Sequence, residues 1–265
     1  MNFIGRAAKS VKIDIARLIL IAGGAAAIMW AVAVFPVFWS EKAVTDVAAA
    51  ITRGEAFDPK VLAAVEAPTE GKSASIRAAM LSKVAMIRLR QMENANNGSD
   101  RALIEQRLTS VTRIVRETLS NAPDDPFSWL AWSWIDTYRN GVRPESLRYL
   151  RMSYELGPYE GWIAVKRDGI ALGLFGSLPQ DLRQRATSEF VGLVRWGLDA
   201  DAAEIAAGPA RPIRATLFPE LKQLNYEQRR AFANAVYARQ LDDVPVPGVP
   251  PPAPPVSMPV VPPNL

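Results

Sequence analysis

Arginines interleaved with aromatic residues, between positions 134 and 151, are the residues best suited to chemistry in this sequence. Guanidinium groups hold carboxylates through paired hydrogen bonds, and aromatic rings offer flat faces for stacking. This combination suits an anionic sugar or a peptide carboxylate. The simpler interpretation is a solvated helix face on which Arg151 pairs with Glu155, four residues later. The predicted partner-binding residues are Tyr138, Arg139, Arg143, Arg148 and Arg151.

Acidic residues offer a second kind of chemistry. Asp124, Asp125 and Glu145 could supply the two carboxylates that glycoside hydrolysis requires. However, Asp residues just before a helix are typical caps, because their carboxylates accept hydrogen bonds from the first free backbone N–H groups. We therefore assign no catalytic residue and expect a protein that is not an enzyme, with a carboxylate-based enzyme as the alternative.

Three tryptophans, Trp129, Trp132 and Trp134, fall within six residues of one another. Successive residues of a helix turn by 100°, which would point these side chains in different directions. We therefore expect most of them in the core and one exposed, rather than a single aromatic binding face.

Several classes of site are excluded by composition. The 265 residues contain no His and no Cys, which removes the commonest general base, the Ser/His triad, thiolate chemistry and nearly all zinc sites. No phosphate-binding Gly-rich loop, dinucleotide fingerprint or HExxH pattern occurs. The sequence therefore predicts no cofactor and no metal.

The net charge of +4 is concentrated at the N-terminus. Residues 1–17 carry four cationic side chains and one Asp, a balance of +3, which leaves +1 for the rest of the chain. Because a nucleic-acid-binding domain needs a basic patch of its own, this distribution gives little support to a DNA or RNA partner.

A stretch without any ionisable group runs from Leu18 to Ser40. About 20 such residues, rising 1.5 Å each, cross the hydrocarbon core of a bilayer. More positive charge precedes the stretch than follows it, which places the N-terminus in the cytoplasm. The alternative is a cleaved signal peptide, although the apolar part of such peptides is normally shorter. Gly23, Ala27 and Ala31 recur every four residues and would let a second membrane helix approach closely.

Helical periodicity dominates the remainder. Apolar stripes occur before and after the polar turn at 94–99, which predicts two amphipathic helices in an antiparallel hairpin. The first stripe is formed by Ile76, Met80, Val84 and Ile87. The second is formed by Ile104, Leu108, Val111, Val115 and Leu119.

Two further hairpins follow. Pro126 opens a helix capped by Asp124 or Asp125, which ends near Gly141, and Pro144 opens its partner. The third hairpin pairs 161–175 with 179–198, whose stripe contains Leu182, Ala186, Phe190 and Leu193. A last helix is expected from Asn225, which forms a capping box with Gln228.

Residues 121–158 resemble a tetratricopeptide repeat. Trp129 stands near the early Trp of that repeat, Tyr138 near its later Tyr, Gly141 in its inter-helix turn and Pro158 at its closing Pro. The Leu-Gly pair of the repeat is absent, since Ala131 and Trp132 follow Leu130. The boundary residues Pro126 and Pro158 are 32 apart, near the 34-residue period of the repeat. The resemblance implies an α-solenoid that binds proteins.

A short single-pass anchor followed by a helix pair that ends in RMSYELGP is also similar to small proteins associated with bacterial envelope polysaccharide machinery. This second resemblance implies an inner-membrane location with the bulk of the chain in the periplasm.

The last 22 residues, from Val244 to Leu265, include ten prolines. Such a composition cannot form a core and favours an extended polyproline II tail. We expect a disordered end, with a ligand for an aromatic groove as the alternative.

The expected fold class is therefore all-α, with an N-terminal transmembrane helix, an α-solenoid of stacked helical hairpins and a disordered Pro-rich tail. The expected segments are a cytoplasmic basic N-terminus (1–17), a transmembrane helix (18–40), a connecting helical segment (41–72), a tetratricopeptide-like domain (73–243) and the tail (244–265).

The function expected from these observations is that of a membrane-anchored periplasmic scaffold that binds another protein, within an envelope polysaccharide assembly or export system. The expected partners are a protein at the membrane and a second copy through the membrane helix. The alternative is an envelope protein that binds or processes carbohydrate.

Overall fold

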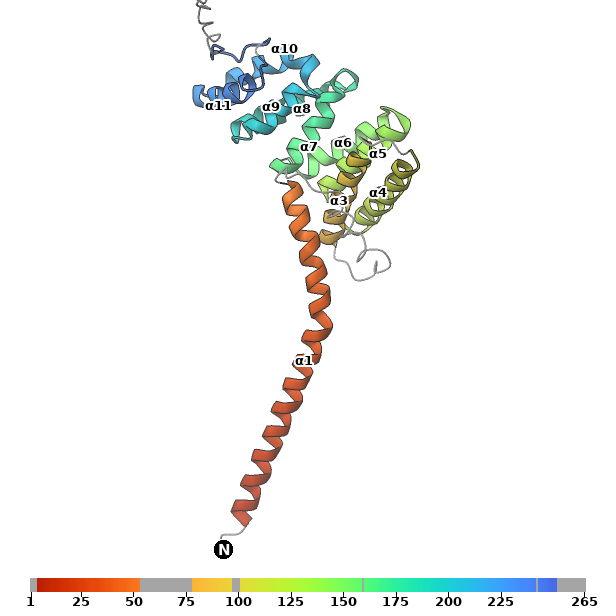
Figure 1. Cartoon of the computed structure of the whole chain (residues 1–265), viewed down its shortest axis with the longest axis vertical. Coiled ribbons are helices and arrows are strands. Elements are labelled where there is room, and N and C mark those ends of the chain that lie inside the picture. Colours follow the sequence, from red (N-terminus) through yellow and green to blue (C-terminus); the bar gives the residue numbers. More distant parts are fainter. Residues whose placement is uncertain (1–3, 53–77, 97–100, 159, 242, 252–265) are drawn as a thin grey trace, which may run out of the picture. The chain divides into compact units, whose positions relative to one another are not determined.

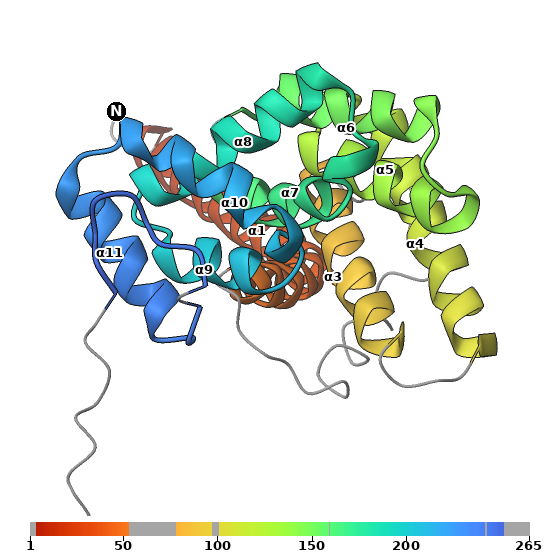
Figure 2. The ribbon, with the colours of Figure 1, turned by 90° about the horizontal axis from the view of Figure 1, so that it is seen from above.

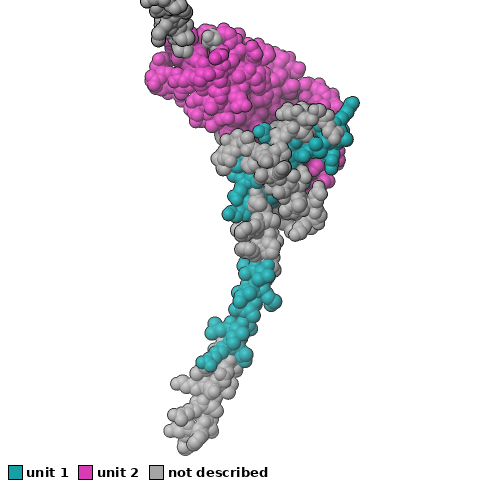
Figure 3. All heavy atoms as spheres, in the orientation of Figure 1, with its two compact units in different colours: residues 1–107 teal, residues 108–265 magenta. Residues whose placement is uncertain are grey.

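The computed structural model describes residues 4–52, 78–96, 101–158, 160–241 and 243–251. Within α1 and α3, described below, it gives the side chains of residues 17–32, 42, 44–52 and 80–91. The described chain is helical and contains no strand, as expected for an all-α protein. It divides into two compact units, residues 1–107 and 108–265 (Figure 3).

The first unit contains α1 (Ile4–Thr52) and α3 (Ala78–Asn96). Figure 1 shows α1 as one long continuous helix. Its last turns bury Val44, Ala48 and Ile51, which repeat at helical spacing and form the face that packs on α3. The ammonium of Lys83 on α3 donates a hydrogen bond to the hydroxyl of Thr45 (3.1 Å). The connecting segment predicted at 41–72 is thus helical to Thr52, and its remainder lies outside the described residues.

Within the described residues, no helix combines the length and the apolar character needed to cross a membrane. The predicted span of 18–40 is helical throughout, but its side chains are described only as far as Val32. The described side chains of that stretch are all exposed, including Leu20 and Trp30 and the predicted dimer strip Gly23, Ala27 and Ala31.

The predicted first hairpin corresponds to α3 and α4 (Arg101–Asn121). Met80, Val84 and Ile87 are buried on α3, and Leu108, Val111 and Val115 are buried on α4, so the two stripes identify the covered faces correctly. Ile76 lies outside the described residues. The pairing of these two helices stays a prediction, because they fall largely in different units.

The second unit is built around the helix pair α5 (Pro126–Asn140) and α6 (Pro144–Leu156). Both begin with the predicted proline in their first turn. Asp125 caps α5, since its carboxylate accepts a hydrogen bond from the backbone N–H of Ser128 (2.9 Å). The helix ends at Gly141, whose φ of 76° strongly favours glycine.

The next pair consists of α7 (Gly161–Gly173) and α8 (Gln180–Arg195), joined through the short 3-10 turn η2 (Phe175–Ser177). The predicted stripe of α8 is fully buried: Leu182, Ala186, Phe190 and Leu193. The first helix of this pair also touches α5, since the rings of Phe127 and Trp162 lie 5.3 Å apart. Gly157, between the two helix pairs, lies so close to Pro126 that a Cβ there would come within 2.7 Å of its ring.

The remaining elements pack against α7 and α8, and the last helix also packs on α9 (Figure 2). Phe232 on the last helix is packed edge-on between Phe190 and Phe218, with ring centres 5.8 and 5.5 Å away. Both bonds of the predicted capping box of Asn225 and Gln228 are present, at 2.9 and 3.2 Å. These elements are α9 (Asp199–Ala207), η3 (Arg211–Ile213), α10 (Arg214–Leu217), η4 (Phe218–Gln223) and α11 (Tyr226–Tyr237).

The start of the Pro-rich tail is more ordered than its composition predicts. Val246 and Val249 are buried, and the Tyr237 hydroxyl donates to the carbonyl of Val249 (3.0 Å). The buried guanidinium of Arg214 also forms an ion pair with Asp243 (2.8 Å). Prediction of a disordered tail from 244 was therefore wrong at its N-terminal boundary. Residues 252–265 lie outside the described chain.

The cap of α5 can be tested by comparing Asp125→Ala with Asp124→Ala. Loss of an N-cap side chain leaves a backbone N–H without its partner, so Asp125→Ala should lower the free energy of unfolding by about 1 kcal/mol. Asp124 is exposed and makes no capping bond, so its substitution should change stability by less than about 0.5 kcal/mol. Urea unfolding of the full-length protein in detergent, followed by tryptophan fluorescence, measures both values. Equal losses would show that Asp125 is not the cap.

Candidate functional site

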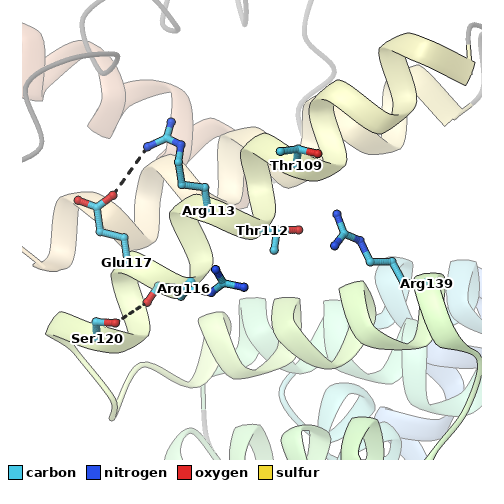
Figure 4. Close-up of a pocket in the computed structure, with 7 residues that line it drawn as sticks. All are labelled: Thr109, Thr112, Arg113, Arg116, Glu117, Ser120 and Arg139. Atoms are coloured by element: carbon cyan, nitrogen blue, oxygen red, sulfur yellow. Dashed lines mark hydrogen bonds and ion pairs between the residues drawn. The ribbon is translucent and has the colours of Figure 1, made fainter.

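An open groove of about 560 Å³ runs along α4 in the second unit and is lined mainly by arginine and hydroxyl side chains (Figure 4). We call it the arginine groove. Its lining residues are Thr109, Thr112, Arg113, Arg116, Glu117, Ser120 and Arg139.

The helix periodicity of α4 explains why six of these residues share one surface. Leu108, Val111 and Val115 turn one face of the helix into the core. The lining residues recur at intervals of three or four along the opposite face, as neighbours on a helix surface do. Arg139 is contributed by α5, in its last turn, where a cation interacts favourably with the helix dipole.

The groove is electropositive, because it contains three guanidinium groups and one carboxylate. Arg113 and Glu117 form an exposed pair at 3.9 Å, a geometry that contributes little to stability. The guanidinium of Arg116 lies 5.7 Å from the centre of the Trp132 ring, within range of a cation–π interaction. Arg116 and Arg139 have no ion-pair partner in the described part of the chain.

The hydroxyl groups of the groove are oriented by the backbone of α4. The Thr112 hydroxyl donates to the carbonyl of Leu108 (2.6 Å), and the Ser120 hydroxyl donates to that of Arg116 (2.9 Å). Their protons are therefore occupied, and the guanidinium N–H groups are the main free donors in the groove. In Figure 4, Arg116 and Arg139 extend toward the same side of α4, where Thr112 lies.

The five predicted partner-binding residues do not share one site, and they make different contacts. Arg139 lines the groove. Tyr138 is 43% exposed and stacks on Trp134, with ring centres 5.4 Å apart. Arg143 forms an ion pair with Asp136 (2.6 Å), and Arg148 is exposed.

Arg151, the fifth of them, reaches across to α8 and binds Asp181 at 2.8 Å. This bond lowers the pKa of the Asp181 carboxyl. The alternative pairing of Arg151 with Glu155 was wrong, since Glu155 lies 3.9 Å from Arg185 of α8. Both ion pairs link α6 to α8.

The tryptophan interpretation also needs correction. Trp129 and Trp132 are three residues apart, so they lie only about 60° apart around the helix. Both pack on Tyr149 of α6, at 5.9 and 6.3 Å between ring centres. All three tryptophans are half-buried, whereas the expectation was that most would lie in the core. Their faces are engaged by neighbouring aromatic rings and by Arg116.

A second cluster of titratable groups is fully enclosed between α6, α7 and α8. Arg167 is 0% exposed and forms paired bonds with Glu189, donating from Nε (2.8 Å) and from Nη2. It also donates to the backbone carbonyls of Ser153 (2.6 Å) and Gly157 (2.9 Å). Its guanidinium lies 4.3 Å from the ring centre of Tyr154. This cluster joins three helices, and its burial favours a structural role.

Asp168, next along the chain, is completely buried, and neither of its carboxyl oxygens has a hydrogen-bond partner in the structure. Burial raises its pKa well above the ordinary value, and the nearby Glu189 adds to the rise. Burial also raises the pKa of Glu189, although the bonds from Arg167 oppose this. Burial is also the main cause of the raised pKa of the Tyr154 hydroxyl.

The predicted acidic set does not form a paired site in the described chain. Asp125 serves as the α5 cap, and Asp124 and Glu145 are exposed. No group of three or more acidic side chains suited to a metal ion occurs among the residues described.

Comparison with known proteins found no match: no family model, no curated protein and no solved structure is similar to this chain.

The titration of Asp168 can be tested with Asp168→Asn. Because the folded state holds the Asp168 proton more tightly than the unfolded state does, stability should fall as the pH rises above about 4, by up to about 1.4 kcal/mol per pH unit. Asp168→Asn should remove this contribution, so the variant gains stability relative to wild type as pH rises toward 8. Urea unfolding of the full-length protein across this pH range measures the difference.

Asp181→Asn is the matched control, because the pKa of Asp181 is lowered in the folded protein. The stability that it contributes is present above its unfolded pKa and is lost as the pH falls through the lower folded pKa. Its substitution should therefore lower stability at neutral pH, with a difference that disappears in strong acid. Parallel pH profiles for wild type and Asp168→Asn would refute the assignment of a raised pKa to Asp168.

Proposed function

We propose that this chain is a single-pass protein of the bacterial inner membrane whose helical domain is a periplasmic scaffold that binds another protein. Residues 1–17 are cytoplasmic, residues 18–40 cross the bilayer, and the rest of the chain lies on the periplasmic side. The proposal rests chiefly on the uncovered apolar surface of α1.

That surface is extensive. From Leu18 to Val32 every side chain on α1 is exposed, and the large apolar ones expose about two thirds or more of their area. Exposing so much apolar area to water is unfavourable, at roughly 25 cal/mol per Å². A helix that is apolar on all sides is stable when lipid or protein covers it. The 15 described residues continue into eight more without a charge, which together reach the length of a span.

The spacing of the helices supports the scaffold. The helix α7 begins 35 residues after α5, and α8 begins 36 residues after α6. This period is close to the 34 residues of tetratricopeptide units, in which stacked helix pairs form extended binding surfaces. We therefore propose that these two pairs are tetratricopeptide-like units of a solenoid. By the sequence resemblance to envelope polysaccharide-associated proteins, the proposed partner belongs to such a system.

The carbohydrate-processing alternative requires two carboxylates about 5 to 10 Å apart in one cleft. The arginine groove contains the carboxylate of Glu117 alone, and that group is paired with Arg113. We therefore do not extend the proposal to catalysis.

The anchor predicts how the protein fractionates. Wild-type protein should stay with membranes during alkaline carbonate extraction. Replacing Ile21 and Ile28 by Lys should move much of it to the soluble fraction, because each Lys in a span disfavours insertion by about 2.5 to 3.5 kcal/mol. The control is Ile21→Leu with Ile28→Leu, which should behave as wild type. Extraction of the wild-type protein by carbonate would contradict the anchor.

The scaffold predicts a stable partner at the membrane. In-cell crosslinking and mass spectrometry on the full-length protein should recover one partner reproducibly. Two truncations separate the contributions of the C-terminus: removal of 252–265 leaves the packed Val246 and Val249 in place, whereas removal of 244–265 deletes them. Loss of the partner in both assigns binding to the outer tail, and retention in both assigns it to the helical domain. Recovery of no partner with any version would overturn the scaffold.

A further inference from the structure

Arg116 and Arg139 are two cationic groups without a counter-charge on the same groove. Three other arginines of the second unit are each paired with a carboxylate: Arg143 with Asp136, Arg151 with Asp181 and Arg214 with Asp243. Within the described chain no carboxylate is bound to either Arg116 or Arg139. The structure thus places two free guanidinium forks, from two different helices, on one open surface.

The chemistry of the groove narrows the class of ligand. A planar guanidinium matches a carboxylate through two parallel N–H···O bonds. The hydroxyl protons of Thr112 and Ser120 are bonded to the α4 backbone, so these side chains add acceptors rather than donors. The dimensions of the groove exceed those of a single small ion, and it is open along α4. A chain segment that carries several carboxylates fits this arrangement.

The surroundings favour a peptide over a sugar. No aromatic residue lines the groove. Trp132, the nearest ring in the contacts of Arg116, is engaged by that guanidinium and by Tyr149. A sugar ring would therefore find no free aromatic face on which to stack its apolar side. The carboxylates of Asp and Glu side chains need only the guanidinium groups.

We propose that the arginine groove binds an acidic segment of the partner protein, through carboxylates held by Arg116 and Arg139. This inference rests on the proposed scaffold function and specifies the chemistry of its docking site. Because Arg113 is paired with Glu117, the net positive charge of the groove comes from Arg116 and Arg139. Because the groups are exposed, the interaction is salt-sensitive, with screening over about 8 Å at physiological ionic strength.

The test measures binding of a fluorescent Glu-rich peptide to the full-length protein in phosphatidylcholine nanodiscs, by fluorescence anisotropy. A Lys-rich peptide of equal length is the ligand control. Arg116→Ala with Arg139→Ala should weaken Glu-peptide binding at least about tenfold, because two charge-assisted hydrogen-bonding groups are lost. Arg116→Lys with Arg139→Lys should weaken it by less, since the charge stays but the fork is lost.

A charge-matched control is Arg211→Ala with Lys222→Ala. Both residues are exposed and lie outside the groove, so their loss changes net charge equally without changing the groove. This variant should bind the peptide within about twofold of wild type. If both double Ala variants weakened peptide binding equally, the effect would come from the net charge of the protein rather than from the groove, and the inference would be overturned.

Competition identifies the ligand class. Oligogalacturonate and inorganic phosphate, each added at matched charge concentration, should displace the Glu-rich peptide less well than unlabelled peptide does. Stronger displacement by either would assign the groove to an anionic saccharide or a phosphate and overturn the peptide proposal.

The same Arg116→Ala, Arg139→Ala variant in the crosslinking experiment separates the two proposals. Loss of the partner with retained membrane association supports both. Retention of the partner overturns the docking site and leaves the scaffold function standing. If wild type captures no partner, the scaffold fails irrespective of peptide binding.

Discussion

The buried guanidinium of Arg167 is the interaction on which the second unit most depends. It joins α7 to Glu189 of α8 and to the carbonyl groups of Ser153 and Gly157 at the end of α6. A buried ion pair contributes little net stability compared with apolar packing, but the loss of one partner is severe because the other charge stays buried. Arg167 therefore determines the relative positions of α6, α7 and α8 more than it adds to the net stability of their packing.

The two carbonyl acceptors show why this position matters for the junction between the two helix pairs. Helices end with free carbonyl groups that need donors. Arg167 supplies donors to the carbonyls of Ser153 and Gly157, while Gly157 allows Pro126 to approach within contact distance. One side chain thus satisfies the end of α6 and aligns the next helix pair. The exposed pair of Arg151 and Asp181 links α6 to α8 as well.

Helices and their ends were predictable from the sequence because their signals are local. Pro126, Asp125 and the Asn225 box act within one turn, and the stripe of α8 repeats at a fixed spacing. The Arg167 cluster was not predicted, since Arg167 and Glu189 are 22 residues apart and neither belongs to a local motif. The burial of Val246 was missed because proline content reports backbone preference, whereas packing on α11 depends on tertiary contacts.

The candidate site was predictable only in part, because it also depends on contacts between residues that are far apart in the sequence. Arg139 was identified from the density of arginines around it, whereas Arg113 and Arg116 were not identified as candidate binding residues. The signal available was their spacing of three on one helix, which places them together but does not show what lies opposite. Their meeting with Arg139 depends on how α4 and α5 lie in the folded unit.

Burial is what separates the two uses of arginine in this protein. Arg167 is removed from water, so its N–H groups must be satisfied within the fold, and it binds Glu189 and backbone carbonyls. Arg116 and Arg139 remain hydrated, so leaving them without a carboxylate costs little. A partner that covered them would remove that hydration and would have to replace it with acceptors of its own. The groove thus selects against apolar segments as well as for acidic ones. An apolar segment that covered Arg116 and Arg139 would leave their N–H groups without hydrogen-bond acceptors, whereas the carboxylates of an acidic segment would accept those bonds.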